Sequence, residues 1–77
     1  MDELAQRVLD LFGQMNSETL DLHTLFEAGG NDPASREQVI DTVSRLVRED
    51  LLVERGSDFY ALTPKGQAAL ANPLANK

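Results

Sequence analysis

Apolar residues at the start of the chain recur at the three- and four-residue spacing of an amphipathic helix. The predicted helix runs from Asp2 to Met15 and opens with two acidic residues, which the positive end of a helix dipole favours. Its inward stripe consists of Leu4, Val8, Leu11, Phe12 and Met15. Leu9 falls off this stripe, so we expect it to lie at the edge of the buried face or to be exposed.

A very short strand and a second helix are predicted next. Thr19 and Leu20 read as an extended stretch, and Asp21 is suited to cap a helix over residues 22–28. Gly29-Gly30-Asn31 then ends this helix, because these residues tolerate the positive φ of a helix C-terminus.

The third predicted helix covers residues 33–49. Asp32 is suited to its N-cap and Pro33 to its first position, while Ser35 with Gln38 offers an alternative capping box. Its apolar face holds Val39, Ile40, Val43, Leu46 and Val47. A projection at ~100° per residue places four polar residues on the opposite face: Gln38, Asp41, Arg45 and Arg48.

Two short β-type runs, residues 51–55 and 59–62, predict a hairpin. If Gly56-Ser57 is a two-residue turn, the inward pairs are Val53 with Tyr60 and Leu51 with Leu62. Thr63-Pro64 then caps a short helix that ends near Ala71. We expect one domain over residues 1–71 and a flexible tail over residues 72–77.

The end of the third helix and the hairpin carry a family-like pattern. Residues 43–52 read VSRLVREDLL, and residues 60–66 read YALTPKG. This stretch resembles the recognition helix and wing of MarR-like and PadR-like prokaryotic regulators, in which L-x-x-x-G-L-V precedes Y-x-L-T-x-x-G. The family's glycine falls at Asp50, and Asp is one of the few other residues that adopt left-handed φ.

The resemblance covers roughly residues 19–70 and implies a fold of the α+β class, mostly α. This fold is the winged helix-turn-helix, a three-helix core with a short β-hairpin wing and a short C-terminal helix. It also implies DNA binding in transcriptional regulation. The lack of cysteines and of a basic-then-apolar signal pattern leads us to expect a cytoplasmic location. The third helix (about 34–49) would enter the major groove of double-stranded DNA, and the wing (55–58) would touch the backbone. The implied DNA contacts are Ser35, Arg36, Gln38, Thr42, Arg45, Arg55 and Ser57.

The net negative charge of the chain argues against strong DNA binding by a single copy. The chain carries 13 acidic and 7 basic residues, a net charge of −6, and residues 1–32 hold only one of the basic ones, Arg7. DNA binding needs cations to match the phosphates, so it is expected mainly of a homodimer, which doubles the contacts. Arg45 also lies four residues from both Asp41 and Glu49, so ordinary ion pairs within the helix are an alternative explanation for it.

The alternative function is an acidic winged-helix module that binds a protein and no DNA. The hairpin register above puts Leu52 opposite Ala61, with Phe59 beside them, on the outer face of the hairpin. These three residues, together with Leu9, are the candidate interaction surface. The competing interpretation is that the last helix or the tail covers this face, for instance through Leu70 or Leu74.

The sequence gives little support for a metalloprotein, an enzyme or a membrane protein. The chain has no Cys and a single His23, so it offers no thiolate zinc site and no cluster of imidazoles, and we expect no metal and no cofactor. Asp21 lies near His23 in sequence, but no nucleophile motif accompanies them, so we do not expect an enzyme. No apolar run approaches the ~20 residues that span a bilayer, so no membrane association is expected.

Overall fold

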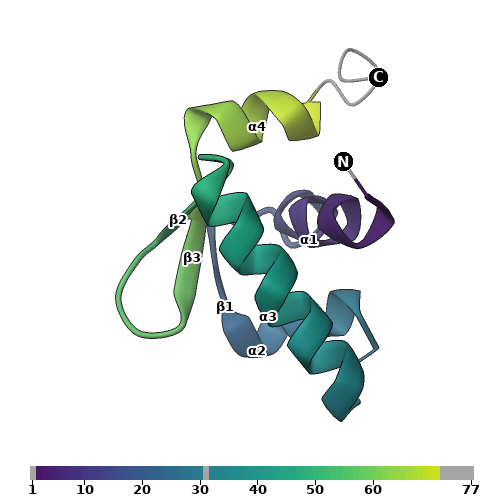
Figure 1. Cartoon of the computed structure of the whole chain (residues 1–77). Helices are drawn as coiled ribbons and strands as arrows, with labels where there is room; N and C mark the ends of the chain where they lie inside the picture. The colour runs from purple at the N-terminus through teal and green to yellow at the C-terminus, as the bar shows by residue number, and fades with distance from the viewer. Residues whose placement is uncertain (1, 31, 72–77) are drawn as a thin grey trace.

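The structure is a computed structural model that describes residues 2–30 and 32–71. Helices dominate it, and a small antiparallel sheet of three strands joins them (Figure 1). The predicted tail, residues 72–77, lies outside the described residues. The elements in chain order are α1 (Glu3–Gln14), β1 (Thr19–Asp21), α2 (Leu22–Leu25), the 3-10 turn η1 (Phe26–Ala28), α3 (Pro33–Arg48), β2 (Leu52–Glu54), β3 (Phe59–Leu62) and α4 (Pro64–Ala71).

The first helix begins where its capping residue predicts, but its buried stripe is shifted from the predicted one. The Asp2 carboxylate accepts a hydrogen bond of 2.8 Å from the backbone N–H of Ala5, which satisfies one of the free donors of the first turn. Leu9 is fully buried, and Met15 is 55% exposed. The prediction was therefore wrong for both residues. Met15 leaves the core because α1 ends at Gln14 and the chain turns away with a φ of 50° at Asn16.

Both ends of α3 follow from residues identified in the sequence. Pro33 occupies the first turn, and the Asp32 carboxylate accepts a hydrogen bond from the Ser35 backbone N–H at 3.4 Å. Asp32 is thus the N-cap, and the alternative capping box at Ser35 does not form the helix start. After Arg48 the chain leaves the helix, and Asp50 has the expected left-handed φ, 64°.

Replacing Asp50 by glycine is expected to stabilise the protein by about 1 kcal/mol, because glycine adopts this φ without the steric strain of a Cβ. The expected result is a higher midpoint in urea denaturation. Asp50→Asn is the matched control, since it removes the charge but keeps a side chain that tolerates left-handed φ. An equal gain from Asp50→Asn would show that charge, not backbone conformation, limits stability here.

The sheet order is β1-β3-β2, and the hairpin register differs by one residue from the prediction. Leu52 pairs with Leu62, Val53 with Ala61 and Glu54 with Tyr60. The loop contains three residues, 56–58, because the Arg55 N–H donates to the Phe59 carbonyl and both Gly56 and Asp58 have positive φ. A one-residue slip exchanges the faces of a strand, so Leu52 points into the core and Val53 points outward.

A tight corner joins β3 to α4. The Thr63 hydroxyl accepts a hydrogen bond of 2.9 Å from the Gly66 N–H and donates to the Asp50 carbonyl, so it caps α4 and ties it to the end of α3. Lys65 adds a hydrogen bond of 3.0 Å from its Nζ to the Glu49 carbonyl. The threonine and glycine of the YALTPKG motif therefore have a structural role in this chain.

One cluster of buried side chains holds these elements together. Two members come from the sheet, Leu20 of β1 and Leu52 of β2, and the other members come from α1, α2, α3 and Leu51. The last helix contributes only partly buried side chains, Ala69 and Leu70. As a result the inner face of the sheet rests on the helices, while α3 keeps its outward side uncovered.

Candidate functional site

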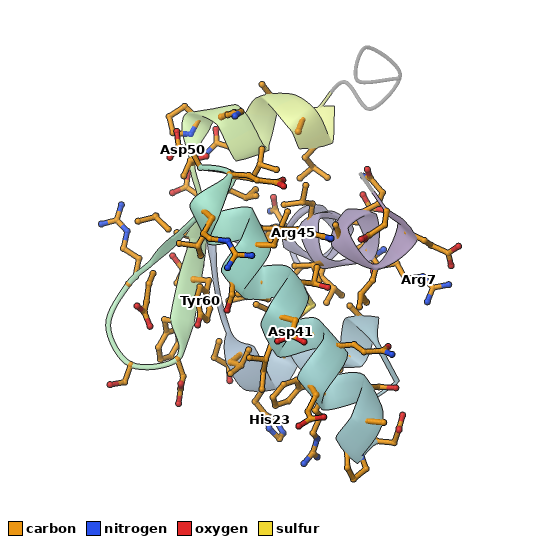
Figure 2. The ribbon with its side chains drawn as sticks, viewed as in Figure 1. Arg7, His23, Asp41, Arg45, Asp50 and Tyr60 are labelled. Atoms are coloured by element: carbon orange, nitrogen blue, oxygen red, sulfur yellow. The ribbon has the colours of Figure 1, made fainter. Side chains whose placement is uncertain are left out.

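The outward side of α3 is exposed along the whole helix. Figure 2 shows Asp41 on the side of α3 that faces the reader, with no other ribbon in front of it. The exposed polar residues on this helix are Arg36, Glu37, Gln38, Asp41, Ser44 and Arg48. Arg48 was not among the predicted DNA contacts, although the helical projection already placed it on the same face as Gln38.

Arg45 is engaged by the first helix. Its Nη2 lies 2.6 Å from the Asp2 Oδ2, so the ion pair joins residues 43 positions apart. Figure 2 shows Arg45 extending from α3 toward α1. The predicted pairs with Asp41 or Glu49 are not the ones that form. The ion pair with the capping residue of α1 therefore gives Arg45 a role in joining two helices, beside its predicted role in contacting DNA.

The pKa of Asp2 lies below its ordinary value of 3.8, first because the Ala5 N–H donates to the carboxylate and then because Arg45 does. A carboxyl whose pKa is lowered by folding stabilises the protein above its unfolded pKa, and this stabilisation disappears as the pH falls through the lower, folded value. We therefore expect Asp2→Asn to be less stable than wild type at neutral pH and to lose less stability below pH 3.8. Thermal melts at neutral pH and at acid pH test this. Parallel losses in both proteins would contradict it.

The other predicted contacts on α3 differ in accessibility. Thr42 is only 7% exposed, so it belongs to the core side of the helix and cannot reach DNA. This prediction was wrong because Thr42 follows Val39 by three residues on the buried stripe. Arg36 is exposed, with its guanidinium carbon 5.4 Å from the centroid of the Phe26 ring. Ser35 is half-buried in the first turn, and Gln38 is exposed.

The predicted wing contacts lie at the hairpin loop. Arg55 and Ser57 are both exposed. The Leu22 N–H donates to the Asp58 carbonyl at 2.6 Å, so the base of the loop is fixed to the start of α2. Glu54 and Asp58, close to Arg55 in the same hairpin, are exposed as well, so the loop presents no cluster of cations.

The outer face of the sheet carries the second candidate surface. Phe59 is 48% exposed and Val53 is 38% exposed. Ala61 lies on the same face, but its small side chain between neighbouring strands is only 5% exposed. Val53 was missed because the predicted register placed it inward.

Two of the predicted interaction residues belong to the core. Leu9 is fully buried, and Leu52 is 1% exposed, so neither can contact a partner. Leu70 does not cover the outer face of the sheet, because it packs against α1 beside Gly13. Leu74, the other residue proposed to cover this face, lies outside the described residues.

The two residues considered for catalysis, Asp21 and His23, contact different side chains. His23 is exposed, and its ring meets the Phe26 ring edge-on at 6.3 Å between centroids. The Asp21 carboxylate accepts a hydrogen bond from the Thr24 hydroxyl, which lowers the Asp21 pKa. Across residues 2–30 and 32–71, no group of three or more His, Cys, Asp or Glu side chains is arranged to hold a metal ion. In the same ranges no helix has the length and apolar character to cross a membrane.

An open groove of about 310 Å³ lies between α1 and η1. Charged side chains line much of it: Arg7 and Asp10 from α1, and Glu27 from η1. Arg7 forms an ion pair with Glu3, and Asp10 accepts a hydrogen bond from the Gln6 amide, so both side chains already have partners within α1. The groove is therefore a weaker candidate for ligand binding than the outward side of α3 or the outer face of the sheet.

Comparison with known proteins adds no assignment to either surface. No protein-family model, curated protein or solved structure matches this chain.

Proposed function

We propose that this chain is a winged helix-turn-helix domain that binds double-stranded DNA in transcriptional regulation. The observation that carries the proposal is the uncovered outward side of α3 next to a β-hairpin (Figure 1). The order of elements and the sheet order β1-β3-β2 support the same architecture. In this arrangement α3 enters the major groove, and the loop of residues 55–58 approaches the neighbouring phosphates.

The accessible side chains have suitable chemistry for both kinds of contact. Gln38 can pair with the edge of adenine, and Arg36 can pair with guanine or a phosphate. Arg48 and Arg55 supply further cations for phosphates, and the Ser57 hydroxyl can donate to a phosphate at the loop. Asp41 lies on the same side of α3 and repels phosphates, so the helix must approach the groove mainly through its N-terminal half.

The number of cations limits the affinity. Residues 33–62 contain four arginines and six acidic residues, and Arg45 is already paired with Asp2. We propose Arg36, Arg48 and Arg55 for the phosphates, which is fewer cations than a protein with ~6–10 phosphate contacts needs. A single copy is expected to bind weakly, with a slope of log K against log salt of about −3 (~0.9 per neutralised phosphate).

Single arginine substitutions test the proposal on a generic duplex of about fifteen base pairs at low salt. Arg36→Ala and Arg48→Ala are each expected to reduce the magnitude of the salt slope by about 1 in fluorescence anisotropy titrations. Arg7→Ala is the matched control, since it removes the same charge from α1 and should leave the slope unchanged. If Arg7→Ala weakens binding as much as the α3 variants do, the attraction is nonspecific and α3 is not the contact surface.

A second function, binding of a protein partner, is favoured by the exposure of Phe59 and Val53 on the outer face of the sheet. An exposed aromatic next to an aliphatic side chain is a frequent feature of interaction sites. This surface is separate from the outward side of α3, so the two functions are compatible in one chain.

A further inference from the structure

Five strand residues and Arg55, which directly follows β2, form the outer face of the sheet in two rows. In the first row Asp21 of β1 pairs with Phe59 of β3, and the Arg55 N–H donates to the Phe59 carbonyl at 2.7 Å. Directly opposed residues of antiparallel strands place their side chains on one face. This row therefore presents an anion at one edge, an aromatic ring in the centre and a cation at the other edge.

The second row is uncharged. Thr19 pairs with Ala61, and Ala61 pairs with Val53. Ala61 fills the centre with little exposed area, while Val53 is 38% exposed and Thr19 is exposed. The face as a whole is a small surface with exposed apolar area from Phe59 and Val53 and with charges of opposite sign at its two edges.

We infer that this outer sheet face binds a second copy of the chain. A two-fold axis parallel to β3 and above it places β2 of each copy over β1 of the other. Each Arg55 then faces Asp21 of the other copy, and the two Phe59 rings meet at the centre. The same patch contacts itself in both copies, as the isologous interface of a symmetric dimer requires. Charge complementarity favours a second copy over an unrelated apolar partner, because the two edge charges meet charges of opposite sign when the face pairs with itself.

The association is expected to be weak. A stable interface buries ~800 Å² on each partner, and a face of six residues supplies less than that. We therefore expect concentration-dependent dimerisation, measurable by sedimentation equilibrium up to about 1 mM protein, the range of weak complexes.

Charge reversal at the two edges is the test. Arg55→Asp places two carboxylates opposite each other in the homodimer, and Asp21→Arg places two guanidinium groups opposite each other. Each variant alone is expected to be monomeric where the wild type is dimeric. An equimolar mixture of the two variants is expected to dimerise again, since every edge pair in the mixed dimer is of opposite sign.

A further variant keeps the test decisive if Asp21→Arg fails to fold, since Asp21 is the N-cap residue of α2. Phe59 is half exposed, so Phe59→Ser should keep a folded NMR spectrum and lose the dimer. A wild type that stays monomeric at about 1 mM overturns the inference. A dimer that persists in both Arg55→Asp and Phe59→Ser also overturns it. A third contradicting result is a truncation at residue 71 that shifts the amide signals of this face, since the chain's own tail would then occupy it.

The inference does not depend on DNA binding, and the variants separate the two. Arg48→Ala should weaken DNA binding and keep the dimer, whereas Phe59→Ser should lose the dimer and keep the weak DNA binding expected of a single copy. Arg55 is a candidate for both contacts, so a dimer of this kind removes it from the phosphate-binding set.

Discussion

Gly66→Ala is expected to destabilise the protein by about 3 kcal/mol or more, because the added methyl group has no space. A Cβ at this position would lie 2.1 Å from the Leu51 carbonyl oxygen and 3.1 Å from the Leu62 Cδ2. The Leu51 oxygen belongs to the backbone and accepts a hydrogen bond from the Thr63 N–H. It cannot move aside without breaking the corner between β3 and α4.

Gly13→Ala is the matched control for this substitution. Gly13 lies inside α1, and its added Cβ would meet the Leu70 side chain at 3.4 Å, an ordinary contact. Alanine is the better helix former, so this variant should gain about 0.5–1 kcal/mol. Urea denaturation of both variants measures the difference. Similar stability for Gly66→Ala and wild type would mean that α4 does not pack against Leu51 as described.

Leu9→Ala is the second substitution with a large expected effect, a loss of about 2–5 kcal/mol in the free energy of unfolding. Leu9 is fully buried and belongs to the core cluster with Val8 and Phe12. Removing its side chain leaves a cavity that the neighbouring helices can fill only in part, which adds to the lost hydrophobic burial.

Met15→Ala provides the contrast, because Met15 is 55% exposed and its truncation should change stability by no more than about 0.5 kcal/mol. The pair of variants distinguishes the observed face of α1 from the face that periodicity alone predicts. Thermal or urea denaturation in which Met15→Ala proves the costlier substitution would show that α1 is rotated relative to the structure described above.

The ends of the elements were predictable because their signals are local. Asp32-Pro33 sets the start of α3, Asp50 adopts the left-handed φ that ends it, and Thr63 caps α4. Each of these depends on residues a few positions apart, so the sequence specifies it without knowledge of the tertiary contacts.

The wrong predictions concern the hairpin register and the buried face of α1, which tertiary contacts determine. Loops of two and three residues at Gly56 fit the sequence equally well, and the choice between them reverses the faces of Leu52 and Val53. In α1, a helical stripe through Leu11 and Met15 is nearly as good as one through Leu9. Only packing against the other elements selects between them.

The candidate DNA contacts also divide into those that local sequence predicted and those that depend on tertiary packing. The exposure of Gln38 follows from its place in the helical projection, and the structure agrees. Arg36 is exposed as well, although the projection did not place it on the polar face. The partner of Arg45 could not be found from spacing, because Asp2 lies 43 positions away from it in the sequence. Local spacing favoured Asp41 and Glu49, whereas the packing of α1 against α3 brings Asp2 to the guanidinium.

The most direct test of DNA binding through α3 is an amide-resolved NMR titration of the whole chain with a duplex of about fifteen base pairs at low salt. We predict shifts confined to the exposed side of α3, centred on Arg36 and Gln38, with weaker shifts in the loop of residues 55–58. Unchanged spectra at saturating duplex, or shifts spread evenly over α1 and α4, would contradict the proposal.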